Sequence, residues 1–205
     1  MKYLFLASSF ATVAGVFAEF VADRLQGGRV AFIPTASINE EVTFYVEAGR
    51  KALEALGLSI DVLELSSATP EVIQAKLAGC DCIYVSGGNV FFLLRELRRT
   101  GADRLLVEQI VAGKPYVGES AGAVVLAPHL AYIRDMDDLS AVQGLDSLAG
   151  LGLIDFYPLP HYTNAPFQEC AARIEAKYRD AVDLYPFSNH QAILMSGDTI
   201  RIANA

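Results

Sequence analysis

The chain has 205 residues, of which 53% are hydrophobic and 20% are charged, and its net charge is −8. This length and composition predict a single globular domain, residues 1–205, and exclude an intrinsically disordered chain. Because the net charge is negative and the lysines and arginines form no cluster, we expect neither a nucleic acid nor a membrane as a partner.

The first 20 residues allow two interpretations. A single lysine followed by apolar residues resembles a signal peptide. The alternative is a buried strand over residues 2–7 followed by a helix over residues 10–25. Charged residues at positions 19, 23 and 24 fit the period of that helix, so the strand and helix are favoured.

Strand and helix patterns then alternate along the chain. Strands are predicted over residues 29–35, 58–65, 81–89 and 114–120, and helices over residues 39–57, 69–79 and 90–113, with Asn39 capping the first helix and a break at Gly101. This alternation predicts an α/β fold with a mostly parallel sheet and helices on both faces. In such sheets, functional sites form at the carboxyl ends of the strands.

The pattern is less regular after residue 128. A strand is expected within residues 152–162, ending at His161, and a helix over residues 166–180. Residues 192–203 predict a hairpin that turns at Gly197-Asp198.

The three cysteines, Cys80, Cys82 and Cys170, are odd in number and lack C-x-x-C spacing. This pattern favours buried, reduced thiols over a disulfide framework or a zinc site. Reduced thiols in turn favour a cytoplasmic location.

Residues 118–122 read Gly-Glu-Ser-Ala-Gly, between a short predicted strand and the helical sequence AGAVVLA. In this setting G-x-S-x-G is typical of a nucleophile elbow, in which Ser120 stands on a sharp turn. The alternative is a tight turn made of small residues. A second turn, Ser86-Gly87-Gly88-Asn89, also follows a strand and opens a helix. Gly88 is therefore a candidate for a second oxyanion-hole donor, although a Gly-Gly pair alone indicates only a turn.

A serine nucleophile needs a base, and the chain has three histidines. His129 lies beyond the helix that leads away from Ser120, so we expect it at the surface. His190 precedes the final hairpin. His161 follows a predicted strand and should lie at the same carboxyl edge as Ser120, which makes it the candidate base.

Four segments resemble the peptidase E family of serine peptidases, which includes aspartyl dipeptidases and is related to cyanophycinases. They are IPTAS (33–37), SGGNVFFLL (86–94), GESAGAVV (118–125) and LPHYTN (159–164). They occur in the family's order, so the resemblance covers essentially the whole chain. It implies a three-layer α/β sandwich like that of class I glutamine amidotransferases, which is flavodoxin-like.

The resemblance implies Ser120 as nucleophile, His161 as base, and an oxyanion hole formed by the N–H groups of Gly88 and Ala121, with no metal and no cofactor. The chain departs from the family at residues 188–191, Ser-Asn-His-Gln, where aspartyl dipeptidases have an acidic residue. Asn189 can accept from the imidazole N–H, as an asparagine does in Cys-His-Asn sites. Ser188 is the other possible orienting residue.

A preference for an acidic substrate residue would require a cation near the pocket. Arg134 is the candidate, with the alternative of a surface arginine paired with Asp135 or Asp137. These aspartates are also candidates for binding the free amino group of a peptide.

The sequence therefore predicts a serine peptidase that hydrolyses short peptides, including dipeptides with N-terminal aspartate, through an acyl-enzyme. Two alternatives stay open. One is a hydrolase of a nonpeptide amide or ester, and the other is a non-catalytic binding or stress-response module, which predicts that His161 lies far from Ser120. The sequence leaves open whether the chain is a monomer or a homodimer.

Overall fold

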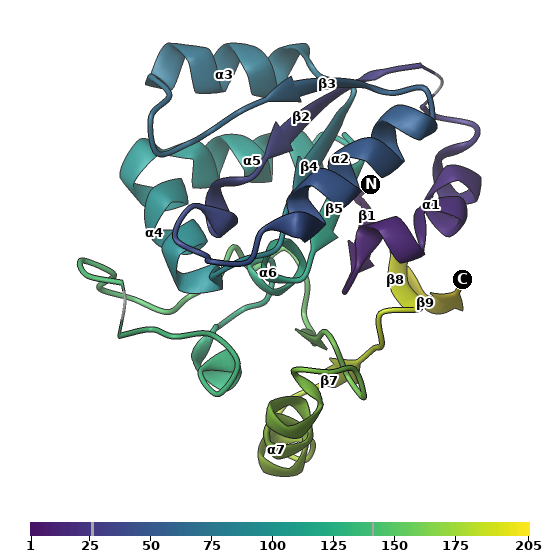
Figure 1. Ribbon diagram of the computed structural model, residues 1–205. Helices are drawn as coiled ribbons and strands as arrows, with labels where there is room; N and C mark the ends of the chain where they lie inside the picture. Colours follow the sequence, from purple (N-terminus) through teal and green to yellow (C-terminus); the bar gives the residue numbers. More distant parts are fainter. Residues whose placement is uncertain (26, 141) are drawn as a thin grey trace.

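The computed structural model describes residues 1–25, 27–140 and 142–205. A seven-stranded sheet of order β3-β2-β4-β5-β1-β8-β9 forms its centre (Figure 1). The first five strands in this order run parallel, β8 pairs antiparallel with β1, and β9 pairs antiparallel with β8. Their bounds are β1 Tyr3–Ala7, β2 Arg29–Ile33, β3 Ser59–Val62, β4 Cys82–Val85, β5 Tyr116–Glu119, β8 Gln191–Ser196 and β9 Thr199–Asn204.

The parallel part of the sheet has the strand order of a flavodoxin-like fold, with one difference. Counted from β2, the order is 2-1-3-4 followed by β1, which takes the place of a fifth strand. The N-terminal strand therefore lies in the middle of the sheet between β5 and β8. Its carboxyl end is next to that of β5, where the predicted elbow begins.

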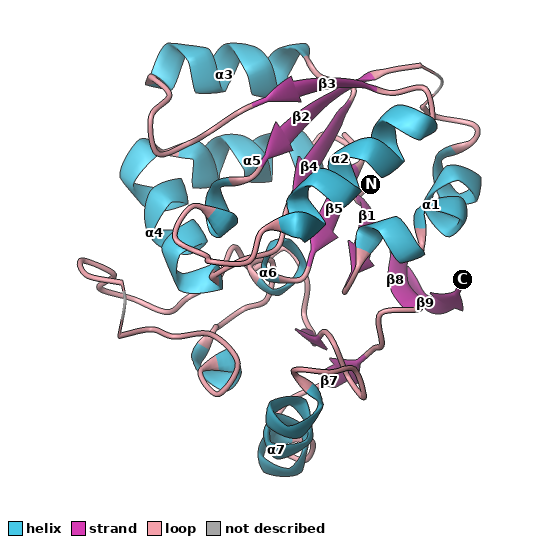
Figure 2. Ribbon diagram, viewed as in Figure 1, coloured by secondary structure: helices cyan, strands magenta, loops and turns pink. Residues whose placement is uncertain are grey.

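Helices cover both faces of the sheet (Figure 2). Along β1, Leu4 and Leu6 point into one core cluster, whereas Phe5 and Ala7 point into the other. The helices α1 and α2 cover the second cluster, and α3, α4, α5 and α6 cover the first, which makes three layers. The bounds are α1 Ala14–Val21, α2 Phe44–Ala55, α3 Pro70–Gly79, α4 Val90–Thr100, α5 Ala102–Val111 and α6 Ala121–Val124, with short 3-10 turns η1 Phe10–Thr12, η2 Thr35–Ser37 and η3 Ala131–Ile133.

A second, two-stranded sheet lies below the main sheet in Figure 1 and carries the end of the chain toward the final hairpin. It pairs β6 Tyr157–Leu159 with β7 Leu184–Pro186 in parallel, and α7 Gln168–Tyr178 connects the two strands. Candidate residues follow both strands: His161 comes after β6, and Asn189 comes after β7.

The strand prediction for residues 2–7 and the hairpin prediction are confirmed, but several helix boundaries are wrong. The expected helix over residues 10–25 divides at Val13 into η1 and α1, and α1 ends at Val21. The Phe10 N–H at the start of η1 bonds to the buried Glu119 carboxylate. The expected helix over residues 39–57 begins at Phe44. Asn39 lies instead in the turn after η2, where the Glu40 N–H bonds to the Ser37 carbonyl at 3.0 Å.

The helix after Ser120 is also shorter than expected and ends at Val124. The carbonyls of residues 125–127 accept hydrogen bonds from the N–H groups of residues 151–153. These tertiary bonds replace the bonds that would have continued the helix. Among the described residues, no helix is both long and apolar enough to cross a membrane. Cys80 and Cys82 are buried free thiols, as predicted, and Cys170 is partly buried.

Candidate active site

Ser120 stands on a strained turn between β5 and α6. Its φ of 47° and ψ of −106° lie outside the regions that a serine usually occupies. Gly118 and Gly122 make the turn possible, because a Cβ on Gly118 would lie 2.5 Å from the Gly122 carbonyl oxygen. The Ser120 N–H donates to the Ala7 carbonyl at 2.8 Å, which fixes the turn to the end of β1. The geometry is that of a nucleophile elbow.

The Gly-Gly turn after β4 lies beside the elbow. A Cβ on Gly87 would be 3.3 Å from the Ser120 Cβ, and Gly88 has a φ of 129° that side chains rarely allow. Within the described chain, the N–H groups of Gly88 and Ala121 donate to no protein acceptor. Two free main-chain donors near a serine hydroxyl can stabilise a developing oxyanion.

His161 lies within hydrogen-bonding distance of Ser120, with 2.8 Å between Nε2 and the serine Oγ. It follows β6 in a turn with a φ of 58°, and its ring stacks on Phe167 with 4.8 Å between the centroids. The expectation of a non-catalytic module in which these two side chains lie far apart is therefore wrong. His129, by contrast, is exposed, as predicted.

Asn189 is the third member of the chain of hydrogen bonds. Its Oδ1 lies 2.8 Å from Nδ1 of His161. Because an amide oxygen only accepts, this contact places the imidazole proton on Nδ1 and leaves Nε2 free to accept the serine proton. Asn164 supports both residues: its N–H donates to the His161 carbonyl at 2.9 Å, and its Oδ1 accepts from the Asn189 N–H at 2.8 Å.

A buried serine joins the two sheets at the site. The Ser8 hydroxyl, directly after β1, accepts from the His161 N–H at 3.0 Å and donates to the Phe187 carbonyl at 3.1 Å. It thus connects the segments that carry His161 and Asn189 to the main sheet. Sequence reasoning missed Ser8, because nothing in the chain marks this serine as different from Ser9.

Sequence reasoning also missed Glu119, the residue before the serine, which is only 2% exposed. Its carboxylate accepts from the Phe10 N–H at 2.8 Å, from the Tyr84 hydroxyl at 2.7 Å and from the Gly87 N–H. Burial raises the pKa of this carboxyl group. The network connects the elbow to the Gly-Gly turn, and the charged residue inside an otherwise small-residue motif was its only signal in the sequence.

The environment of the histidine also affects its basicity. Burial lowers the pKa of His161, and the hydrogen bond to Asn189 opposes that shift only in part. The neutral imidazole that a general base requires is therefore favoured at neutral pH.

Arg134 and Asp135, the candidates for substrate binding, are both exposed on the turn after η3. In the described part of the chain, neither forms a hydrogen bond or ion pair with the other or with Ser120, His161 or Asn189. Asp137 lies closer to the site, since its Oδ2 accepts from the Val90 N–H at the start of α4 at 2.8 Å. Desolvation raises the pKa of Asp137 to about 7.

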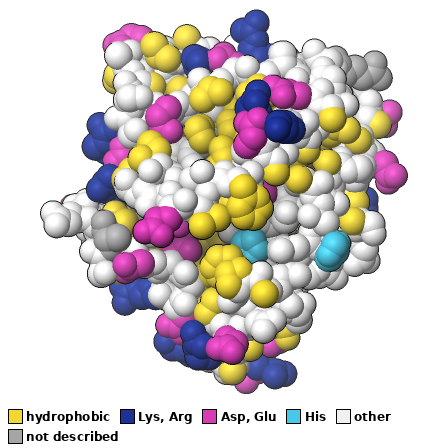
Figure 3. All heavy atoms as spheres, in the orientation of Figure 1, with side chains coloured by type: hydrophobic (Ala, Val, Ile, Leu, Met, Phe, Trp, Pro, Cys, Tyr) yellow, Lys and Arg dark blue, Asp and Glu magenta, His cyan; other side chains and the backbone are white. Residues whose placement is uncertain are grey.

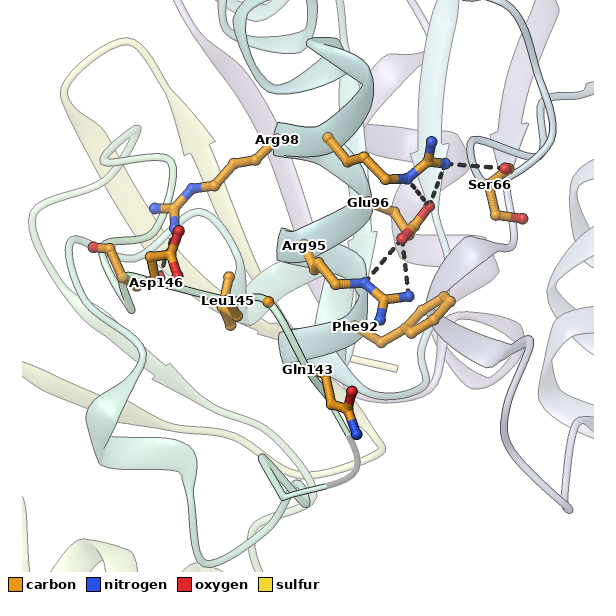
Figure 4. A pocket seen from close by; sticks show the side chains of 11 residues that line it. Ser66, Phe92, Arg95, Glu96, Arg98, Gln143, Leu145 and Asp146 are labelled. Atoms are coloured by element: carbon orange, nitrogen blue, oxygen red, sulfur yellow. Dashed lines mark hydrogen bonds and ion pairs between the residues drawn. The ribbon is translucent and has the colours of Figure 1, made fainter.

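The described residues contain no group of three His, Cys, Asp or Glu side chains that could hold a metal ion. A hollow of about 810 Å³ between α4 and residues 143–147 carries Arg95, Arg98 and Arg99 (Figure 4). These guanidinium groups are committed to internal partners: Arg95 and Arg99 to the buried Glu96, and Arg98 to main-chain carbonyls. Arg98 therefore holds the loop against α4, whereas Arg95 and Arg99 neutralise a carboxylate of their own helix.

Comparison with known proteins assigns the chain to a family. Residues 4–203 match the model of Peptidase family S51. An uncharacterized peptidase of Listeria monocytogenes is 52% identical, over 98% of this chain and 97% of its own length. The peptidase E of Citrobacter koseri is 35% identical over 71% of this chain, and the match spans 60% of that relative.

A solved structure has the same fold. The 1.5 Å crystal structure of a candidate peptidase E protein from Listeria monocytogenes EGD-e is 51% identical, with a TM-score of 0.96 over 100% of this chain and 99% of that chain. These matches confirm the resemblance to peptidase E that the four sequence segments indicated. Because the family model and close relatives cover nearly the whole length, the chain belongs to Peptidase family S51 and is a peptidase of the serine type.

Proposed function

We propose that the protein hydrolyses short peptides through an acyl-enzyme on Ser120, with His161 as general base and Asn189 as the orienting residue. One observation carries the proposal: the two 2.8 Å hydrogen bonds that join the three side chains in series. The order of donors and acceptors in this series suits removal of the serine proton.

In the first half of the reaction, Ser120 Oγ attacks the peptide carbonyl while its proton passes to His161 Nε2. The carbonyl oxygen becomes negatively charged, and the Gly88 and Ala121 N–H groups stabilise it. His161 then gives the proton to the leaving amine as the C–N bond breaks. In the second half, His161 removes a proton from water, which attacks the acyl-enzyme, and the proton returns to Ser120.

Asn189 can orient the imidazole but cannot neutralise its positive charge. In a serine protease with an aspartate at this place, the amide substitution costs about 10⁴ in turnover, largely because the histidine adopts the wrong tautomer. Here the amide oxygen faces Nδ1, so the tautomer suits catalysis and only the charge stabilisation is missing. We therefore expect a working but slow enzyme.

The acyl-enzyme is the direct test. After rapid mixing with a short peptide ester and acid quenching, mass spectrometry should find the acyl group on the peptide that contains Ser120. A burst of released alcohol equal to the enzyme concentration should accompany it. Hydrolysis of the ester with neither a burst of alcohol nor an acyl group on Ser120 would contradict this mechanism.

The pH dependence should report the lowered pKa of His161. Because only the neutral imidazole accepts a proton, the acid limb of kcat/KM is expected to have its midpoint below 6.5. Asn189→Asp places a carboxylate against the ring, raises the pKa of His161 and should move the midpoint to higher pH. The profiles are measured in an Asp137→Asn background, because Asp137 itself titrates near 7. If Asn189→Asp does not move the midpoint of the acid limb, a group other than His161 is responsible for that limb.

Ser8 provides a second prediction, as a positioning residue. Ser8→Ala removes the acceptor for the His161 N–H and the donor to the Phe187 carbonyl, so the imidazole should shift and kcat should fall by about tenfold to 100-fold, with KM little changed. The matched control is Ser9→Ala, which loses only a bond to the Thr12 hydroxyl and should retain kcat within about twofold. Equal kcat values for the two variants would remove Ser8 from the catalytic geometry.

A further inference from the structure

Aromatic side chains flank the reacting pair on two sides. On the side of the Gly-Gly turn, the Tyr45 ring and the Ser120 Cβ both lie 3.3 Å from the position of a Cβ on Gly87. Phe44 packs edge to face against Tyr45, with ring centroids 6.0 Å apart. On the other side, Phe167 stacks on His161. Ser120 and His161 therefore have aromatic side chains on two sides: the wall formed by Phe44 and Tyr45, and the Phe167 ring.

The wall at the start of α2 is open to solvent. Phe44 is 75% exposed, Val42 is 60% exposed and Ile38 is 46% exposed, three of the eight large hydrophobic side chains that are exposed in the described chain. Figure 3 shows hydrophobic side chains gathered over the start of α2, next to a histidine. A contiguous exposed apolar surface beside a reactive site indicates that a ligand covers it.

The ionisable side chains that act on the Tyr45 hydroxyl are acidic. Burial raises the pKa of the Tyr45 hydroxyl most, and Glu40, Glu119 and Asp137 raise it further. Among the described residues, no lysine or arginine forms a hydrogen bond or ion pair with Ser120, His161 or Asn189. An acidic substrate side chain placed beside Tyr45 would therefore meet carboxyl groups, because every charged group that acts on the Tyr45 hydroxyl in the described chain is acidic.

We infer that Phe44 and Tyr45 bind an apolar or aromatic side chain of the substrate residue whose carbonyl is attacked, and that the site disfavours an acidic residue there. This rests on the proposed function. The reaction indicates which part of the substrate contacts Phe44 and Tyr45, because His161 must face the leaving amine in order to protonate it. Phe44 and Tyr45, beside the Gly87-Gly88 turn, would therefore contact the acyl part of the substrate.

The first test uses the unmodified protein and aminoacyl 7-amido-4-methylcoumarins that differ only in the amino acid. With a constant leaving group, kcat/KM for the Leu and Phe substrates should exceed that for Ala by about tenfold or more, and Asp should be the poorest. A kcat/KM for Asp equal to or above that for Leu overturns the inference. Failure to hydrolyse any member of the series overturns it as well.

The second test removes the exposed ring. Phe44→Ala should reduce the ratio of kcat/KM for the Phe substrate to kcat/KM for the Ala substrate by about tenfold. Because Phe44 is 75% exposed, the variant should fold normally. The control is Val111→Ala, an apolar residue that is 55% exposed at the end of α5. It precedes β5, whereas Ser120 follows the carboxyl end of that strand, so this variant should keep the original ratio. Equal losses for both substrates in Phe44→Ala would count against binding by this wall.

The same series separates this inference from the proposed function. If Ser120→Ala abolishes hydrolysis of every substrate and Asp is nevertheless preferred, only the specificity is wrong. If Ser120→Ala retains hydrolysis, the proposed mechanism is wrong, whichever substrate is preferred.

Discussion

Ser120→Ala is expected to lower kcat for a short peptide by about 10⁴-fold to 10⁶-fold. In the proposed mechanism the Ser120 hydroxyl is the attacking group, and its Oγ lies 2.8 Å from Nε2 of His161. The substitution should leave the fold intact, because the side chain bonds to no other residue within the described chain and alanine accepts the same backbone angles as serine. The measurement is kcat with a dipeptide, with circular dichroism and the thermal midpoint as checks on folding.

His161→Ala provides the companion measurement. If serine and histidine act as a unit, each single variant should lose nearly as much kcat as the double variant, because removing either one stops the same proton transfer. If the fold loss in kcat of the double variant equals the product of the two single losses, the two residues act separately. Folded Ser120→Ala protein with more than about 1% of the original kcat would rule out the serine mechanism altogether.

Local features of the site could be predicted from the sequence because short-range geometry determines them. The strand before residue 118 and the glycines around Ser120 specify a sharp turn, whatever the rest of the chain does. Likewise, Gly87 and Gly88 come one residue after the end of β4, and Asn89 caps α4 by accepting from the Phe91 and Phe92 N–H groups. Parallel strands then bring both turns to one edge of the sheet.

Long-range features could not be predicted in this way. Sequence distance does not show that Ser8, at the end of a central strand, meets the backbone of His161 in a different sheet. Nor does it show that Glu119 points back into the core and not toward substrate. Arg134 was a candidate because the resemblance to aspartyl dipeptidases implied an acidic substrate residue, but it lies on an exposed turn. Hydrogen bonds between distant segments decide these placements, and no local pattern encodes them.

Gly88→Ala is the other substitution with a large expected effect, about 10² to 10³ in kcat. Gly88 has a φ of 129°, and a Cβ there would lie 2.2 Å from the Ala36 carbonyl oxygen. The turn must therefore move, and the Gly88 N–H must move with it, away from the site of the oxyanion. The loss should appear in kcat more than in KM, because the N–H acts on charge that develops in the transition state.

A second glycine separates catalysis from backbone strain. Gly101, between α4 and α5, also has a positive φ, of 75°, but a Cβ there would have no atom within 4 Å. Gly101→Ala should therefore lower the free energy of unfolding by about 1 kcal/mol without changing kcat. If Gly88→Ala and Gly101→Ala lose stability alike but only Gly88→Ala loses kcat, the Gly88 N–H acts in the reaction. Equal kcat values in the two variants would mean that the oxyanion is stabilised elsewhere.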